Sequence, residues 1–72
     1  MTDRPRIGDR VKYTRRGSTV RREGTVERYT YSRTGRELLQ VRVDTVGGHP
    51  LMPCSTVRID ERYVEIISRW AR

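Results

Sequence analysis

Residues 19–44 read TVRREGTVERYTYSRTGRELLQVRVD and contain the clearest pattern in the chain. Apolar and polar side chains alternate with period two on both sides of the polar segment SRTGR at 32–36, as in a β-hairpin. The first strand is predicted over residues 19–32 and the second over residues 37–44. Gly24 interrupts the first strand, and an internal glycine usually marks a bulge or a sharp bend. This stretch therefore predicts a bent antiparallel hairpin.

A shorter strand precedes the hairpin. Residues 10–14 alternate in the same way, with Val11 and Tyr13 on one face, and residues 15–18 read as a loop. After the hairpin, residues 45–53 contain two glycines and two prolines. We predict that they are irregular, because proline lacks the N–H that a strand ladder requires.

The end of the chain completes the fold. Residues 55–60 alternate again, residues 60–63 resemble one tight helical turn, and residues 64–68 form a last strand. Five short strands and one helical turn predict an all-β, five-stranded closed barrel, since closure removes exposed strand edges. We expect this domain at residues 7–70, after a flexible basic arm at residues 1–6.

Composition supports one small β domain. A chain of 72 residues buries only one modest core, and Val, Ile and Thr supply 20 residues against a single Ala. No apolar stretch approaches the about 20 residues of a membrane span, and the lone Cys54 favours a reducing, cytoplasmic location. The predicted core contains the apolar residues that alternate with polar neighbours: Val11, Val26, Val41, Val43, Val57, Ile59, Val64 and Ile66.

The basic charge is concentrated in one half of the chain. Residues 1–36 hold 11 basic and 4 acidic side chains, whereas residues 37–72 hold five of each, so the first half carries the whole formal charge of +7. All the basic residues except Lys12 are arginine, whose planar fork pairs with phosphate through two hydrogen bonds. This asymmetry points to a polyanion partner, with DNA and RNA both open.

The predicted nucleic-acid-binding residues are basic side chains and two tyrosines of the N-terminal half: Arg10, Lys12, Arg15, Arg16, Arg21, Arg22, Arg33, Arg36, Tyr29 and Tyr31. Regular alternation would expose both Tyr29 and Tyr31. A bulge at Gly24 or beyond would instead turn one of them into the core. Arg58 and Arg69, in the neutral half, are expected to contribute much less.

Three short motifs resemble known barrels. The segments GDRV at 8–11, GTV at 24–26 and ERYVEII at 61–67 are similar to the opening and closing segments of SH3-like barrels of the KOW and Tudor-like type. The resemblance covers about residues 7–68. It implies a binding module, because KOW domains bind RNA or ribosomal partners and Tudor-like domains bind peptides or DNA.

The GDRV motif is also similar to the opening of the plasmid-borne type II dihydrofolate reductases. That resemblance implies a Val-Gln-Ile-Tyr segment before a proline, which holds folate and nicotinamide. Aligning that proline with Pro53 places HPLM, residues 49–52, in the segment, so the required Gln and Tyr are absent. We therefore expect no reductase activity.

Other chemical groups are sparse. His49 is predicted to be an exposed loop residue, Cys54 a buried small hydrophobe, and Asp9 the residue that shapes the first turn. Metal sites need clustered ligands, which the sequence does not offer. We expect no enzyme, no cofactor and no membrane partner. The alternative to a nucleic-acid-binding module is a protein-interaction module that engages an acidic protein or forms a homo-oligomer.

Overall fold

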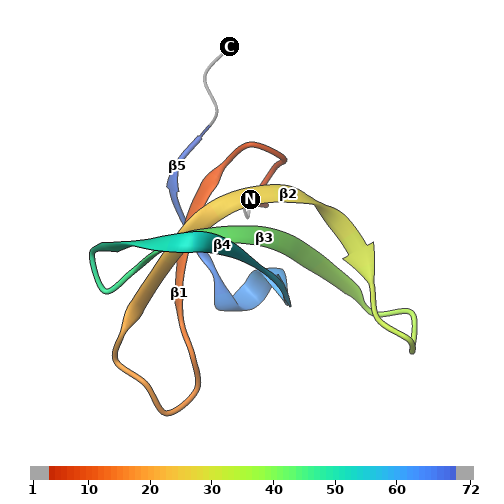
Figure 1. The fold of residues 1–72 in the computed structure, drawn as a ribbon. Helices are drawn as coiled ribbons and strands as arrows, with labels where there is room; N and C mark the ends of the chain where they lie inside the picture. The colour runs from red at the N-terminus through yellow and green to blue at the C-terminus, as the bar shows by residue number, and fades with distance from the viewer. Residues whose placement is uncertain (1–3, 70–72) are drawn as a thin grey trace.

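The computed structural model describes residues 4–69, which form five antiparallel strands in one sheet (Figure 1). The strand order is β4-β3-β2-β1-β5, and one turn of 3-10 helix precedes the last strand. The elements are β1 (Arg10–Thr14), β2 (Arg21–Tyr31), β3 (Glu37–Val46), β4 (His49–Ile59), η1 (Glu61–Tyr63) and β5 (Glu65–Ser68). The predicted all-β fold with five strands and one helical turn is confirmed.

The prediction of a closed barrel is wrong. The sheet stays open, with β4 and β5 as its two edge strands. β5 is only four residues long and pairs with β1, whereas β4 contains Pro50 and Pro53 and pairs with β3. Proline is tolerated on an edge strand because the outer side of that strand needs no ladder hydrogen bonds. The sheet curves around its core without joining its edges (Figure 1).

The core lies on the inner face of the curved sheet. Its buried side chains are Val11, Tyr13, Val26, Leu39, Val41 and Val43. Four of the predicted core residues are in this cluster, and burying each is worth about 1.5–3 kcal/mol. The other four are half-buried and pack against the cluster from the flanks of the sheet: Val57, Ile59, Val64 and Ile66.

Gly24 marks the point where β2 crosses closest to β3. A Cβ atom at this position would lie 2.4 Å from the Arg42 carbonyl oxygen, which no side chain tolerates. The β2–β3 register shifts here, because Asp44 has no partner on β2. The bulge predicted at Gly24 is therefore present, with the additional residue on β3.

A second bulge, at Glu27, settles the orientation of the two tyrosines. Glu27 has no partner on β3, which reverses the alternation of β2 after Val26. Tyr29 consequently pairs with Leu39 and packs against the core, while Tyr31 remains 63% exposed near the hairpin. Of the two alternatives, the one in which a bulge beyond Gly24 turns one tyrosine toward the core is confirmed, and that tyrosine is partly buried.

The segment predicted to be irregular, residues 45–53, is mostly strand. Gly47 and Gly48 have φ angles of +60° and +83° and form a two-residue turn between β3 and β4. This backbone conformation matches the twist of a β-hairpin and favours glycine. Register with β3 is lost over residues 51–54 and resumes at Ser55, so the irregularity is confined to a bulge on the edge strand.

The predicted hairpin tip at residues 32–36 and the predicted helical turn are confirmed. In the β2–β3 hairpin the Ser32 N–H donates to the Arg36 carbonyl oxygen at 2.8 Å. Asp60 caps the 3-10 turn, since its carboxylate accepts from the Arg62 N–H at 3.1 Å. No helix within residues 4–69 is long and apolar enough to cross a membrane.

Candidate nucleic-acid interface

A groove of about 450 Å³ opens beside the β1–β2 loop. The end of β1, the loop, the start of β2 and the edge strand β4 all contribute to its walls. The lining residues, which together define the arginine groove, are Tyr13, Thr14, Arg15, Arg16, Arg22, Ser55, Val57, Arg58 and Ile59.

Strand pairing places Arg22 on the inner face of the sheet, at the end of the core. Arg22 is the register partner of Tyr13, so both side chains lie on the inner face of the sheet. Tyr13 is buried, whereas Arg22 is half-buried at the end of the strand. Val57 and Ile59 of β4 pack against the same core and leave part of their surface open to the groove. The groove thus has an apolar floor and a cationic end.

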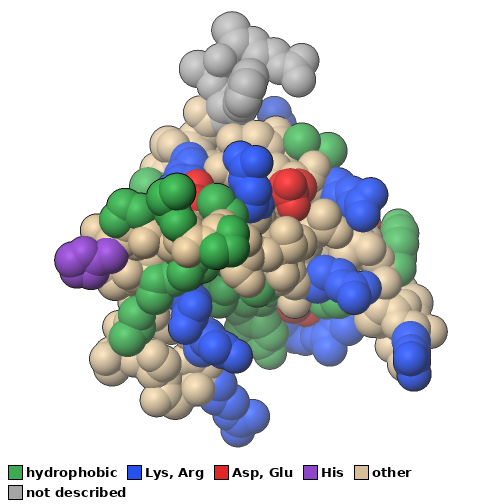
Figure 2. Space-filling model, viewed as in Figure 1, with side chains coloured by type: hydrophobic (Ala, Val, Ile, Leu, Met, Phe, Trp, Pro, Cys, Tyr) green, Lys and Arg blue, Asp and Glu red, His purple; other side chains and the backbone are tan. Residues whose placement is uncertain are grey.

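The β1–β2 loop holds two more arginines at the rim. Gly17, with φ of +79°, reverses the chain, and the Ser18 N–H donates to the Arg15 carbonyl oxygen at 2.9 Å. The side chains of Arg15 and Arg16 are exposed. In Figure 2, Lys and Arg side chains project from the lower part of the molecule, where Figure 1 places this loop.

The acidic side chains form ion pairs with basic residues that do not line the arginine groove. Within residues 4–69, every acidic side chain except Glu27 forms an ion pair with a basic one. Among these described residues, Arg15, Arg16 and Arg22 have no acidic partner. The positive charge of the arginine groove is therefore uncompensated.

Arg22 also has a hydrogen-bond donor without a partner in the described part of the chain. Its Nε atom is buried and has no hydrogen-bond acceptor within the described part of the chain. Burying a polar group without a partner costs about 1–3 kcal/mol, so such groups are rare in folded proteins. The Nε–H of Arg22, a residue that lines the groove, is thus a donor without an acceptor.

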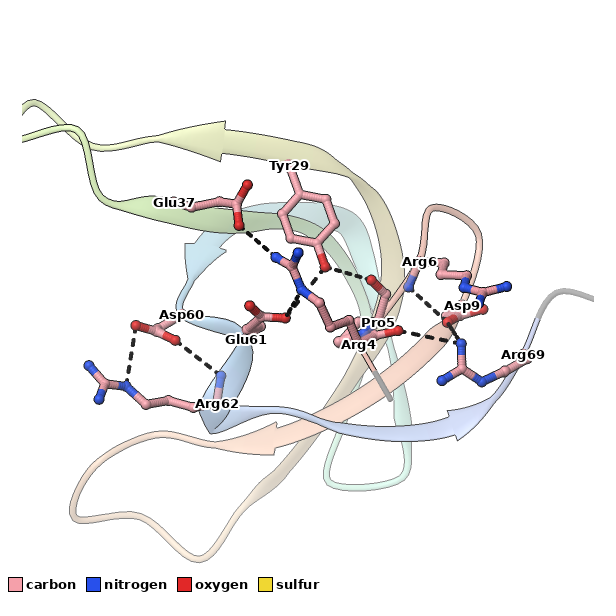
Figure 3. Close-up of polar contacts among 10 residues, drawn as sticks. All are labelled: Arg4, Pro5, Arg6, Asp9, Tyr29, Glu37, Asp60, Glu61, Arg62 and Arg69. Carbon is pink, nitrogen blue, oxygen red and sulfur yellow. Dashed lines mark hydrogen bonds and ion pairs between the residues drawn. The ribbon is translucent and has the colours of Figure 1, made fainter. Parts of the chain in front are cut away.

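A second group of charged residues, shown in Figure 3, attaches the N-terminal segment to the sheet. Arg4 contacts Glu37 at 2.6 Å and Glu61 at 2.9 Å, and its guanidinium lies 4.9 Å from the centroid of the Tyr29 ring. The Tyr29 hydroxyl donates to the carbonyl oxygen of the buried Pro5 at 2.7 Å. We call these five residues the arm cluster. Arg4 and Pro5 of the predicted arm are therefore in contact with the sheet and η1, whereas residues 1–3 of that arm lie outside the described residues.

Electrostatics match this structural role. Hydrogen bonds to Glu61 and Glu37 raise the pKa of Arg4. Desolvation raises the pKa of the Tyr29 hydroxyl, and the negative charge of Glu61 raises it further. Arg4 therefore stays charged and Tyr29 stays protonated across the physiological range. Tyr29, predicted as a base-stacking residue, lies in the arm cluster and not in the arginine groove.

Four other basic residues of the predicted site also have acidic partners. Arg10 makes a two-pronged contact with Asp44, with N–O distances of 2.7 and 3.1 Å, and this contact lowers the pKa of Asp44. The remaining pairs are Lys12 with Glu65 at 3.5 Å, Arg21 with Glu23 at 3.1 Å and Arg36 with Asp60 at 2.7 Å. These basic residues are already partly neutralised.

Arg33 and Tyr31 lie at the β2–β3 hairpin, at the opposite end of β2 from Arg22. Both are exposed. The structure thus brings together Arg15, Arg16 and Arg22 from the predicted set and leaves the hairpin residues apart from them.

Arg58 and Arg69, which were both expected to contribute little to nucleic-acid binding, lie in different surroundings. Arg69 lies 3.2 Å from the carboxylate of Asp9, which is 2% exposed and also accepts from the Arg6 N–H at 2.9 Å. Asp9 therefore shapes the first turn, as predicted. Arg58, in contrast, is one of the residues that line the arginine groove. Sequence reasoning missed this position because it depends on how β4 folds back beside the β1–β2 loop.

Thr14 and Ser55 were also missed. Each adds a hydroxyl-bearing residue to the groove, and neither has a distinguishing sequence signal. His49 is exposed, as predicted, but it is the first residue of β4 and not part of a loop. Cys54, predicted to be buried, is exposed because it lies in the segment of β4 that leaves the ladder.

Comparison with known proteins identifies no relative. No protein-family model matches the chain, and no curated protein or solved structure is significantly similar to it.

Proposed function

We propose that this protein is a small nucleic-acid-binding module that contacts phosphates through the arginine groove and the adjoining β1–β2 loop. The observation that carries this proposal is the distribution of ion pairs. Seven basic residues pair with carboxylates, whereas the groove gathers four arginines that have no acidic partner in residues 4–69: Arg15, Arg16, Arg22 and Arg58. The other arginines without such a partner do not line this groove: Arg6, Arg28, Arg33 and Arg42. Uncompensated arginines gathered on one surface attract a polyanion.

Phosphate contacts would supply most of the affinity. Arginine binds a phosphate through two parallel N–H donors, and each neutralised phosphate releases condensed counterions. If about four to six phosphates are neutralised on duplex DNA, the slope of log K against log salt is about −4 to −5. The module acts by binding, without catalysis or a cofactor, and we place it in the cytoplasm. The resemblance to KOW and Tudor-like binding modules is consistent with this proposal.

The test is an electrophoretic mobility shift with duplex DNA, single-stranded DNA and structured RNA at two salt concentrations. Replacing Arg15 and Arg16 together with alanine should weaken binding to every sequence and flatten the salt slope by about two. Arg42→Ala is the matched control, because Arg42 is exposed between the buried Val41 and Val43 and so lies on the outer face. Equal losses from the groove and the outer face would contradict a defined interface.

One observation favours a protein-interaction function as the second candidate. β4 is an open edge strand, and Met52 on it is 86% exposed. An exposed apolar side chain on a strand edge is suited to self-association. This candidate predicts a concentration-dependent oligomer that Met52→Glu dissociates, together with no nucleic-acid binding at physiological salt. Sedimentation velocity across a range of protein concentrations decides between the two candidates.

A further inference from the structure

The arginine groove combines two kinds of surface that one phosphate group would not use together. Arg15, Arg16 and Arg22 supply cationic side chains, whereas Val57 and Ile59 supply half-buried apolar ones. Sites for small organic molecules have volumes of about 300–1,000 Å³ and combine apolar walls with a few polar groups. The groove, at about 450 Å³, lies in this range and far exceeds the size of one phosphate.

The geometry points to a single unpaired nucleotide as the occupant. We infer that the groove takes one nucleotide of a single strand, with its phosphate on the arginines and its base against the apolar floor of β4. A base inside a duplex is stacked and paired, so it cannot reach this floor without leaving the helix. This inference rests on the proposed function and names its substrate class, which is single-stranded nucleic acid.

Arg22 is the anchor of this arrangement. Its Nε donor is buried without an acceptor within the described residues, and its register partner Tyr13 forms the inner wall of the groove. A phosphate oxygen that draws the guanidinium toward the groove supplies the missing acceptor. The planar fork of arginine fits two phosphate oxygens at once, which the point charge of lysine does not.

The rim and floor would hold the base. Arginine guanidinium planes stack on nucleobases, and Arg15 and Arg16 are exposed beside the groove. The hydroxyls of Thr14 and Ser55 can donate to or accept from a base edge. Stacking contacts of this kind are tolerant of base identity, so we expect weak sequence preference.

The test measures fluorescence anisotropy of a labelled single strand of about 12 nucleotides, a length within the usual site sizes of single-strand-binding domains. A duplex of the same length is measured at the same salt concentration. The single strand should bind about tenfold more tightly. Val57→Thr keeps the shape of the side chain but makes the floor polar, and should reduce this preference while leaving duplex binding unchanged. Circular dichroism checks that the variant is folded.

Arg22→Lys tests the anchor and is matched by Arg42→Lys on the outer face, which makes the same chemical change. Arg22→Lys should weaken single-strand binding about tenfold, because the two-pronged contact is lost. Arg42→Lys should leave it within about twofold.

Competition with small ligands identifies which part of the nucleotide is recognised. A nucleoside monophosphate should displace the single strand at lower concentration than inorganic phosphate or the nucleoside alone.

Equal affinity for single strand and duplex, with both lost on replacing Arg15 and Arg16, would overturn the inference and leave the proposed function intact. Absence of binding to any polymer would overturn the proposed function, and nuclear magnetic resonance titration with the monophosphate would then show whether the groove still accepts a nucleotide. No shift of groove residues would overturn the inference as well.

Discussion

Arginine is the main basic residue of both the arm cluster and the arginine groove, but its partners differ. In the arm cluster Arg4 lies between Glu37 and Glu61, and in the groove Arg15 and Arg16 have no acidic neighbour among the described residues. The first arrangement joins the N-terminal segment to the sheet. The second leaves charge available to a ligand. Net charge alone therefore does not locate an interface, because ion pairing decides which cations remain available.

The largest expected effect is on the stability of the β-sheet to which both regions belong. Gly24→Ala places a Cβ atom 2.4 Å from the Arg42 carbonyl oxygen, so β2 and β3 must separate. We expect a loss of about 3 kcal/mol in the free energy of unfolding, measured by urea denaturation. Gly17→Ala is the control. It has open space around it, and its positive φ costs about 1–2 kcal/mol. Similar losses from both variants would show that the close crossing at Gly24 is unimportant.

A smaller loss of stability is expected on removing the buried carboxylate of Asp9. Asp9→Ala removes the acceptor for the Arg6 N–H and the partner of Arg69. We expect a loss of about 2 kcal/mol in the free energy of unfolding, with unchanged affinity for nucleic acid under folding conditions. Thermal denaturation and the mobility shift measure the two quantities. A fall in affinity at full folding would mean that the paired and unpaired arginines do not act separately.

The contact between Arg10 and Asp44 predicts a pH dependence. Because this contact lowers the pKa of Asp44 in the folded state, it stabilises the protein above the unfolded value of about 3.9. This stabilisation is lost as the pH falls through the folded pKa. Both side chains are about one-third exposed, so we expect less than about 1 kcal/mol. Urea denaturation measures the free energy of unfolding at pH 6 and at pH 3, which lie about two units above and about one unit below that value. The difference between these two free energies should be smaller in the Asp44→Asn variant than in the unaltered protein.

The smallest effect on stability is expected in the groove itself. Replacing Arg15 and Arg16 with alanine removes no ion pair within residues 4–69. The melting temperature should therefore change by no more than about 2 °C, even though binding is lost. Differential scanning calorimetry measures this. A large fall in melting temperature would place these arginines among the structural ones.

Local sequence was sufficient for most of the strands. Period-two alternation located β1, most of β2 and β3, and the end of β4, because side chains of a strand alternate between the core and the solvent. The β3–β4 hairpin was missed at Gly47 and Gly48, although two adjacent glycines between strands are a hairpin signal. The prolines that follow indicated a loop, whereas an open sheet edge accommodates them.

Tertiary structure alone decided where Tyr29 points and which arginines are unpaired. The bulge at Glu27 sends Tyr29 inward, and no residue in that stretch signals an additional position in the ladder. Pairing of charges depends on distances of a few ångströms between residues far apart in the chain. The sequence by itself determined an all-β chain with a basic N-terminal half. Folding then neutralised Arg4 and Arg10 with carboxylates and brought Arg58 into the groove that Arg16 also lines, because long-range strand pairing sets those distances.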